Sequence, residues 1–186
     1  MVYSEKTRKR VMPIQISFEL SDNDLEHFRK MMNEVITKIS QYSPDEVLKK
    51  ARAVTEKAED ASLPEFVRER MQSLQTLIDA LEDLEWQLPE EECSNILASL
   101  AYFSEPNDLV PDHIPGLGYI DDAIMIELVI QDLSQDLNAY KQFCSFRKTE
   151  ERRRGAEANV NRESWLKSIR TELRSNMRRR RQLFSR

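Results

Sequence analysis

The amino-acid sequence predicts an all-α protein, a small bundle of four to five helices with a basic helical tail. Apolar residues recur every three or four positions over most of the chain, which is the spacing of one face of an α-helix. No strand-rich stretch interrupts this pattern, and the 186 residues include only 3 glycines, too few for the turns of a β-sandwich. With 40% hydrophobic and 33% charged residues, the chain has the composition of a soluble domain with a modest core.

The first elements are predicted from local patterns. Residues 1–20 are expected to form a basic N-terminal segment followed by a short extended segment. The extended segment is predicted because apolar and polar residues alternate over positions 14–20. A helix is expected to begin at Ser21 or Asp22. The segment Ser43-Pro44-Asp45-Glu46 is a capping box with proline at the first helical position, which predicts the start of a second helix.

The middle of the chain has two further start signals. Ser62-Leu63-Pro64-Glu65 repeats the same device and predicts a helix that runs to Leu88. Pro89 then starts a strongly apolar helix, whose first turn contains three glutamates that the helix dipole stabilises. A connection with prolines and glycines follows over residues 104–120, and a last apolar helix comes after it. An apolar helix–loop–helix over residues 89–146 is therefore expected at the centre of the bundle.

Residues 21–148 are expected to form this helical body, and residues 149–186 a mobile basic tail. Residues 155–161 are expected to be a joint before a helix that begins at Arg162. One face of that helix is apolar, with Trp165, Leu166, Ile169, Leu173 and Met177. The candidate residues for binding an anion or a partner are the surrounding cations Lys167, Arg170, Arg174, Arg178, Arg179, Arg180 and Arg181. Docking of the tail on the chain's own acidic part needs the fewest assumptions.

The formal net charge of −5 is unevenly distributed along the chain. Acidic and basic residues balance over residues 1–70, whereas residues 71–140 contain 15 acidic residues and no Lys or Arg. Residues 141–186 contain 15 basic and 5 acidic residues. The acidic middle is either a solvated face or a surface that attracts basic partners or the tail, and it repels nucleic acid and anionic lipid.

The connection carries the most distinctive motif, PNDLVPDHIPGLGYIDD at residues 106–122. Its prolines and glycines predict an ordered turn that folds back under the helix pair; they are Pro106, Pro111, Pro115, Gly116 and Gly118. The motif resembles that of the YkvA-like family of bacterial proteins of unknown function, and the resemblance covers about residues 93–135. The resemblance implies a helical architecture without a settled activity, and some relatives are membrane-associated.

Four acidic side chains in this motif permit two interpretations: Asp108, Asp112, Asp121 and Asp122. Divalent cations such as Mg²⁺ or Ca²⁺ take oxygen ligands from loops, although the spacing is not that of an EF-hand loop. The simpler interpretation is structural, with no cofactor. The carboxylates then accept hydrogen bonds from backbone amides, and Asp121 or Asp122 caps the following helix.

Catalytic chemistry has few candidate residues. Nothing in the sequence places His113 beside a nucleophile such as Ser104 or Cys93, and the other histidine, His27, lies on the first helix. Cys93 and Cys144 form neither a ligand cluster nor a disulfide framework, which fits helix packing in a reducing compartment. We therefore expect no catalytic residues.

The resulting expectation is a non-enzymatic interaction or scaffold protein of the cytoplasm. Its acidic body and basic tail would contact a protein partner or a second copy of the chain. No secretory signal opens the chain, and no apolar run approaches the roughly 20 residues of a membrane-spanning helix, so no membrane-spanning segment is expected. Peripheral contact of the tail with an anionic membrane surface stays open. Two alternatives stay open: a divalent-metal-dependent enzyme that uses the loop aspartates, and a nucleic-acid-associated protein whose tail contacts phosphates.

If the motif aspartates bind backbone amides, millimolar Mg²⁺ or Ca²⁺ should leave the melting temperature unchanged, because folding then creates no ion site that would stabilise the native state. Thermal unfolding followed by circular dichroism, with and without each ion, measures this. A rise of several degrees that disappears in Asp112→Asn would establish a metal site instead.

Overall fold

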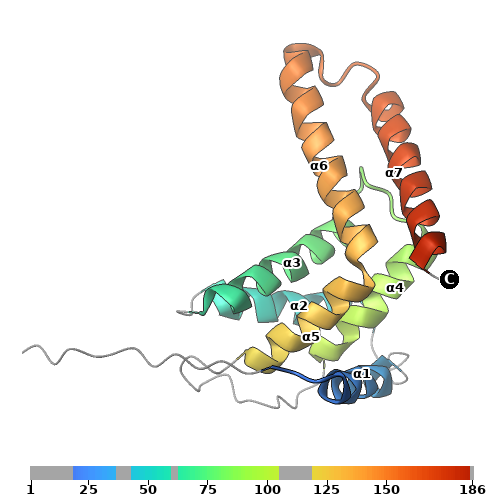
Figure 1. The fold of residues 1–186 in the computed structure, drawn as a ribbon. Coiled ribbons are helices and arrows are strands. Elements are labelled where there is room, and N and C mark those ends of the chain that lie inside the picture. Colours follow the sequence, from blue (N-terminus) through green and yellow to red (C-terminus); the bar gives the residue numbers. More distant parts are fainter. Residues whose placement is uncertain (1–18, 37–42, 60–62, 105–118, 185–186) are drawn as a thin grey trace, which may run out of the picture.

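The computed structural model describes residues 19–36, 43–59, 63–104 and 119–184, and within them the chain is all-α, as the sequence predicts (Figure 1). The described residues contain no strand. Their α-helices are α1 (Asp22–Ile36), α2 (Pro44–Glu59), α3 (Glu65–Glu82), α4 (Glu90–Leu100), α5 (Ile120–Asp132), α6 (Ser134–Arg154) and α7 (Arg162–Phe184). Two short 3₁₀ helices are η2 (Ala101–Ser104) and η3 (Gly155–Glu157). The basic N-terminal segment and most of the extended segment expected before Ser21 lie outside the described residues.

The helix starts predicted at Ser21 or Asp22 and at Ser43 each have a reciprocal pair of local hydrogen bonds. At α1 the Ser21 N–H donates to Asp24 Oδ2 at 2.8 Å, and the Asp24 N–H donates to Ser21 Oγ at 3.4 Å. At α2 the Ser43 N–H donates to Glu46 Oε2 at 2.8 Å, and the Glu46 N–H donates to Ser43 Oγ at 3.3 Å. Each reciprocal pair satisfies two amide groups at a helix start, so both start signals are confirmed.

The start of α3 lies later than the predicted repeat of this device places it. The helix begins at Glu65, and Pro64 stands before it in extended backbone, with no capping hydrogen bond from a side chain. Ser62, the expected capping residue, lies outside the described residues. The proline therefore precedes the helix instead of occupying its first turn.

The end of α3 also differs from its prediction, since the helix stops at Glu82 and not at Leu88. The Asp83 carboxylate accepts hydrogen bonds from the backbone N–H groups of Glu85 and Trp86 at 2.9 and 3.2 Å. An aspartate that binds the backbone two and three residues later stabilises a turn in competition with the helix. The chain consequently leaves the line of α3 and forms a connection over residues 83–89.

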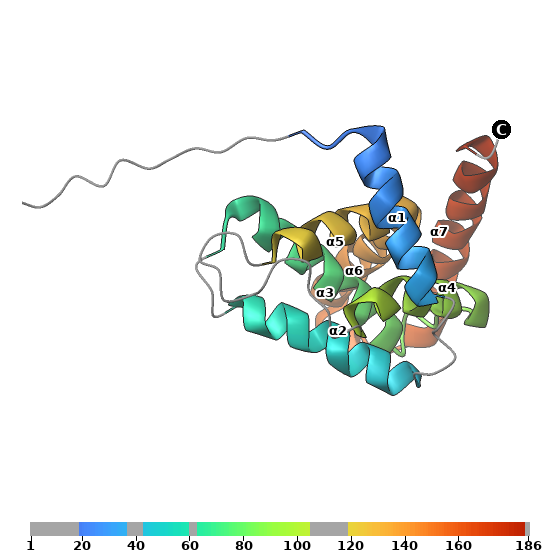
Figure 2. The ribbon, with the colours of Figure 1, turned by 90° about the horizontal axis from the view of Figure 1, so that it is seen from below.

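Helices α1 to α5 enclose the larger of two hydrophobic cores (Figures 1 and 2). α3 packs between α2 and α5, and η2 packs against α1 and α2. The apolar helix pair expected at the centre is there: Leu100 of α4 and Met125 and Val129 of α5 are fully buried, as is Leu74 of α3. This first core is the structural centre of the body.

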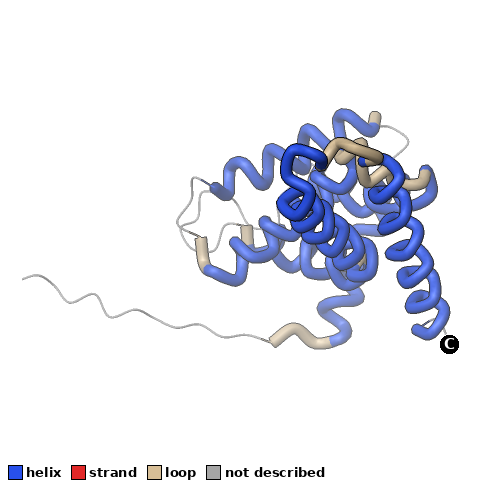
Figure 3. Tube along the Cα trace, turned by 90° about the horizontal axis from the view of Figure 1, so that it is seen from above, coloured by secondary structure: helices blue, strands red, loops and turns tan. Residues whose placement is uncertain are grey.

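The helix expected to continue from the motif to about residue 146 is divided at Leu133. That residue has φ −102° and ψ 17°, outside the α-helical range, so α6 leaves α5 in a new direction. α6 continues through Lys148, where the sequence places the start of the tail, and α7 returns beside it (Figures 1 and 3). We refer to α6 and α7 together as the arm.

The turn between α6 and α7 agrees with its prediction. Gly155 has φ 56° and Asn161 has φ 53°, so the left-handed backbone conformations stand at the two ends of the predicted joint. Glycine adopts this conformation without steric cost, and asparagine tolerates it better than most residues. α7 then begins at Arg162, as expected.

A second hydrophobic core lies between the arm and the connection over residues 83–89. Trp86 of the connection is only 1% exposed, and its ring centroid lies 4.9 Å from Phe143 and 5.8 Å from Tyr140 of α6. The predicted apolar face of α7 closes this core, with Trp165, Leu166, Leu173 and Met177 buried. The tail, which the sequence suggests is mobile, is therefore a helix packed on the rest of the chain.

Truncation of the central indole should destabilise the arm strongly. We expect Trp86→Ala to lower the free energy of unfolding by about 3–5 kcal/mol, because it leaves a cavity where the ring was. Trp86→Phe should cost less, since Trp86 Nε1 has no hydrogen-bond partner among the described residues. Denaturant unfolding measures both. The neighbouring Leu84, which is 89% exposed, supplies the control Leu84→Ala, and an equal loss in that variant would contradict the role of the second core.

Candidate functional site

Most of the distinctive motif lies outside the described residues. The interval 105–118 contains Asp108, Asp112 and His113 together with Pro106, Pro111, Pro115, Gly116 and Gly118. The ordered turn expected there and both interpretations of its aspartates stay predictions. Only the end of the motif, from Tyr119 onward, is described.

Asp121 and Asp122 lie within the first turn of α5, not at its N-cap. The N-cap residue is Tyr119, with a left-handed φ of 69° and no capping hydrogen bond from its side chain, so the predicted cap is wrong. Asp121 is buried, and in this first turn the helix dipole favours both negative charges. No group of three or more His, Cys, Asp or Glu side chains among the described residues is arranged to hold a metal ion.

The described cysteines and histidine have structural surroundings. Burial raises the pKa of the Cys93 thiol, and Glu90 raises it further, so the thiolate needed for nucleophilic chemistry is disfavoured at neutral pH. Cys144 is half-buried, with its Sγ 3.8 Å from Arg147 Nη2. His27 is exposed on α1. These surroundings favour the packing interpretation of the cysteines.

Two of the predicted tail cations, Arg170 and Arg174, bind the α3–α4 connection through its backbone. Arg170 Nη1 donates to the Glu85 carbonyl at 2.6 Å. Arg174 Nη2 donates to the Trp86 carbonyl at 2.8 Å and also to the carbonyl of Gln87, and its guanidinium lies 5.2 Å from the Trp86 ring centroid. Burial lowers the pKa of Arg174. Both guanidinium groups thus have acceptors within the chain, whereas their predicted binding of an external anion stays a prediction.

Glu85 joins the two helices of the arm to the acidic middle of the chain. Its carboxylate accepts hydrogen bonds from Arg162 of α7 and, at 2.9 Å, from Arg147 of α6. Arg147 also pairs with Asp83 at 2.8 Å. The hydrogen bonds from Arg162 hold the pKa of Glu85 below its ordinary value, against the opposing effect of burial. The described part of the tail is therefore docked on the acidic middle.

Sequence analysis did not single out this connection. The sequence feature that could have indicated it is a tryptophan within an otherwise acidic stretch, between two helices and shortly before Pro89. A large aromatic residue in a turn indicates a packing partner, because an exposed indole is unfavourable. That partner is the arm, and the sequence contains no local information on which helix supplies it.

The other tail cations with described side chains are exposed: Lys167, Arg178, Arg179 and Arg180. Arg179 donates to Asn176 Oδ1 within α7, and Arg180 lies toward α6. No Asp or Glu occurs after Leu173, so the C-terminal end of α7 is purely cationic. The side chain of Arg181 is not described. We call Lys167, Arg178 and Arg179 the outer cations of α7.

Comparison with known proteins places a family segment in the first core. Residues 95–128, which include most of α4 and the first part of α5, match the DUF1232 family of proteins of unknown function. The chain carries a DUF1232 segment. Over 48 residues, 26% of the chain, it is 35% identical to a protein of Bacillus subtilis (strain 168) named uncharacterized membrane protein YkvA. The match covers 45% of that relative, so this chain spans less than half of the relative's length.

The resemblance to YkvA-like proteins is thus confirmed for the DUF1232 segment. No solved structure matches the chain. None of the helices in the described ranges has both the length and the apolarity to cross a membrane. The arm begins at Ser134, after the residues that match the family model, so its surface has to be interpreted from its own side chains.

Glu85→Gln should remove an acid-sensitive part of the stability. Because the folded-state pKa of Glu85 lies below its ordinary value of 4.5, its contribution is present above that value and is lost as the pH falls through the folded-state pKa. We expect a contribution of about 1 kcal/mol or less, because the side chain is 35% exposed and partly screened.

Urea unfolding of the wild type and of Glu85→Gln, from neutral pH into the range where carboxylates protonate, measures the difference between their free energies of unfolding. This difference should shrink as the pH falls. The exposed Glu157 of the turn provides the control Glu157→Gln. A difference between the wild type and Glu85→Gln that is the same at every pH would contradict the assignment.

Proposed function

We propose that this protein is a non-enzymatic docking protein of the cytoplasm, which associates peripherally with an anionic membrane surface through the outer cations of α7. The observation that carries the proposal is the division of the cations of α7. Arg162, Arg170 and Arg174 bind acceptors inside the molecule, whereas Lys167, Arg178 and Arg179 are exposed. The second set is available to an external anionic surface.

The apolar face of α7 determines the manner of docking. Isolated basic amphipathic helices bind membranes by burying their apolar face at the headgroup boundary. In this protein Leu166 and Met177 on that face are buried in the second core. Attachment through α7 would therefore be electrostatic, with the helix lying on the surface and not inserted.

Such attachment is weak and reversible. A basic residue near an anionic membrane surface contributes about 1 kcal/mol, and the attraction falls off within a Debye length of about 8 Å at physiological ionic strength. The acidic middle, which has 15 acidic residues and no Lys or Arg over residues 71–140, is repelled by the same surface. The opposite signs would orient the protein with the outer cations of α7 toward the membrane.

Two observations favour a membrane over a nucleic acid as the anionic partner. A relative that is 35% identical over 48 residues of this chain is named a membrane protein. Proteins that bind single-stranded nucleic acids combine cations with exposed aromatic side chains for base stacking. Among the described residues the large exposed apolar side chains are Phe66, Leu84 and Val160, and none of them belongs to α7.

Cosedimentation with lipid vesicles tests the proposal. The full chain should bind vesicles of phosphatidylcholine mixed with phosphatidylserine more strongly than pure phosphatidylcholine vesicles, and added salt should weaken the binding. The triple variant Lys167→Gln/Arg178→Gln/Arg179→Gln should lose most of it, because three attractive charges are removed. Its fold should be retained, since all three side chains are exposed.

The matched control removes three exposed lysines elsewhere, in Lys30→Gln/Lys49→Gln/Lys148→Gln. This variant has the same net charge as the triple variant of α7 and should keep binding. Equal losses in the two variants would show a general charge effect and overturn the assignment to α7. Binding to a single-stranded oligonucleotide without binding to anionic vesicles would overturn the membrane as the partner.

A further inference from the structure

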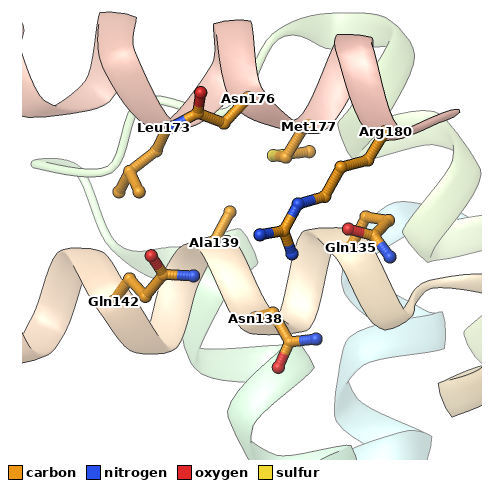
Figure 4. A pocket seen from close by; sticks show the side chains of 8 residues that line it. All are labelled: Gln135, Asn138, Ala139, Gln142, Leu173, Asn176, Met177 and Arg180. Atoms are coloured by element: carbon orange, nitrogen blue, oxygen red, sulfur yellow. The ribbon is translucent and has the colours of Figure 1, made fainter. Parts of the chain in front are cut away.

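A groove lies between α6 and α7 where the second core ends. Toward the start of α7 the two helices meet through buried apolar side chains, the last of which on α7 are Leu173 and Met177. Beyond them the lining becomes polar (Figure 4). Gln135, Asn138, Ala139 and Gln142 line the groove from α6, and Leu173, Asn176, Met177 and Arg180 line it from α7. Its cavity volume is about 30 Å³.

Arg180 belongs to the inner side of α7 by its position in the sequence. It follows Leu173 by seven residues and Met177 by three, which are the spacings of side chains on one helix face. Figure 4 shows its side chain extending from α7 toward α6. A guanidinium group therefore stands where the apolar seam would otherwise continue.

Among the residues that the structure describes, the lining has the donors for an anion and no competing carboxylate. Its polar groups are the carboxamides of Gln135, Asn138, Gln142 and Asn176 and the guanidinium of Arg180. Amide NH₂ groups and a guanidinium donate hydrogen bonds, and hydrogen bonds from a cation to an anion are about twice as strong as neutral ones. The set suits an oxyanion with several acceptor atoms.

Other arginines of this protein have internal carboxylate partners. Ion pairs are formed by Arg29, Arg52, Arg70, Arg147, Arg153, Arg154, Arg162 and Arg170. A second hollow between α3, α5 and α6 illustrates the contrast, since its Arg70 pairs with Glu127 and Glu69 in the same lining. Within the described residues no carboxylate lines the groove at Arg180, so its charge is available to a ligand.

We propose that the α6–α7 groove binds one phosphate group, through Arg180 and the carboxamides of α6. The size of the groove limits the ligand: a cavity of 30 Å³ exceeds the about 10–15 Å³ needed for one water molecule but cannot enclose a nucleotide or a sugar. Only the phosphate end of a larger molecule would enter, and the rest would project into solvent. Free phosphate and a lipid phosphomonoester have the same recognised chemistry.

The groove and the outer cations are separate sites, so this site is tested without a membrane. An NMR titration of the full chain with inorganic phosphate, at constant ionic strength set with chloride, should shift amide signals of residues 135–142 and 176–180. Arg180→Gln should weaken the binding at least about tenfold, which corresponds to about 1.4 kcal/mol. Arg179→Gln removes the neighbouring exposed cation and is the matched control, with binding expected to stay within about twofold of wild type.

A second variant places a competitor in the groove. Asn138 is exposed on α6, so Asn138→Asp should fold and supply Arg180 with an internal carboxylate partner. Phosphate binding should then be lost although Arg180 is present. Unchanged binding in Arg180→Gln, or equal weakening in Arg179→Gln, would overturn the site, because either result means nonspecific attraction.

Vesicles distinguish the two sources of phosphate. Phosphatidic acid presents a phosphomonoester, whereas phosphatidylserine presents a phosphodiester, and the two vesicle types are matched for surface charge. A selective loss of phosphatidic acid binding in Arg180→Gln would support the site with a lipid headgroup as its ligand. Loss of phosphate binding alone, with both vesicle types bound as by wild type, would support it with a free phosphate ligand.

Discussion

The arrangement of this protein depends on the burial of Trp86 between the arm and the body. The Asp83 carboxylate accepts hydrogen bonds from the backbone N–H groups of Glu85 and Trp86, and α3 ends there. Trp86 therefore leaves the line of that helix. The indole then packs on Phe143 and Tyr140, and the apolar face of α7 covers it. Without this contact α7 would lose the largest apolar side chain that the second core receives from outside the arm.

The same connection determines which cations of α7 are used internally. Its backbone carbonyls, left without helical donors by the turn, accept hydrogen bonds from Arg170 and Arg174. The carboxylate of Glu85 in this connection accepts hydrogen bonds from Arg162 and Arg147. Hydrogen bonds to charged groups contribute more than neutral ones, so these contacts add orientation to the apolar packing. The outer cations of α7 do not face the connection and are exposed.

The DUF1232 segment and the arm have different places in the molecule. The segment supplies α4, η2 and much of α5 to the first core, where its apolar side chains are buried. The arm begins after the break at Leu133 and has a core of its own. The family match therefore concerns part of the first core, and it does not reach the arm.

Much of the local structure was predictable from sequence because its causes are local. The capping boxes at Ser21 and Ser43, the joint before Arg162 and the apolar face of α7 depend on residues three or four positions apart, whose contacts a single helix already contains. The charge segregation was likewise visible, and with it the attraction of the tail to the acidic middle. The end of α3 was missed because a helix pattern and an aspartate turn compete over the same residues.

Composition and periodicity by themselves determined that this chain is all-α, since those properties are summed over neighbouring residues. Tertiary structure alone decided which arginines are buried and which face outward. Arg170, Arg174 and Arg178 have the same chemistry and similar neighbours in sequence, and they differ only in whether a carbonyl from some 85 residues earlier lies within reach. The packing of Trp86 brings these carbonyls close to α7, and no local sequence pattern specifies that packing.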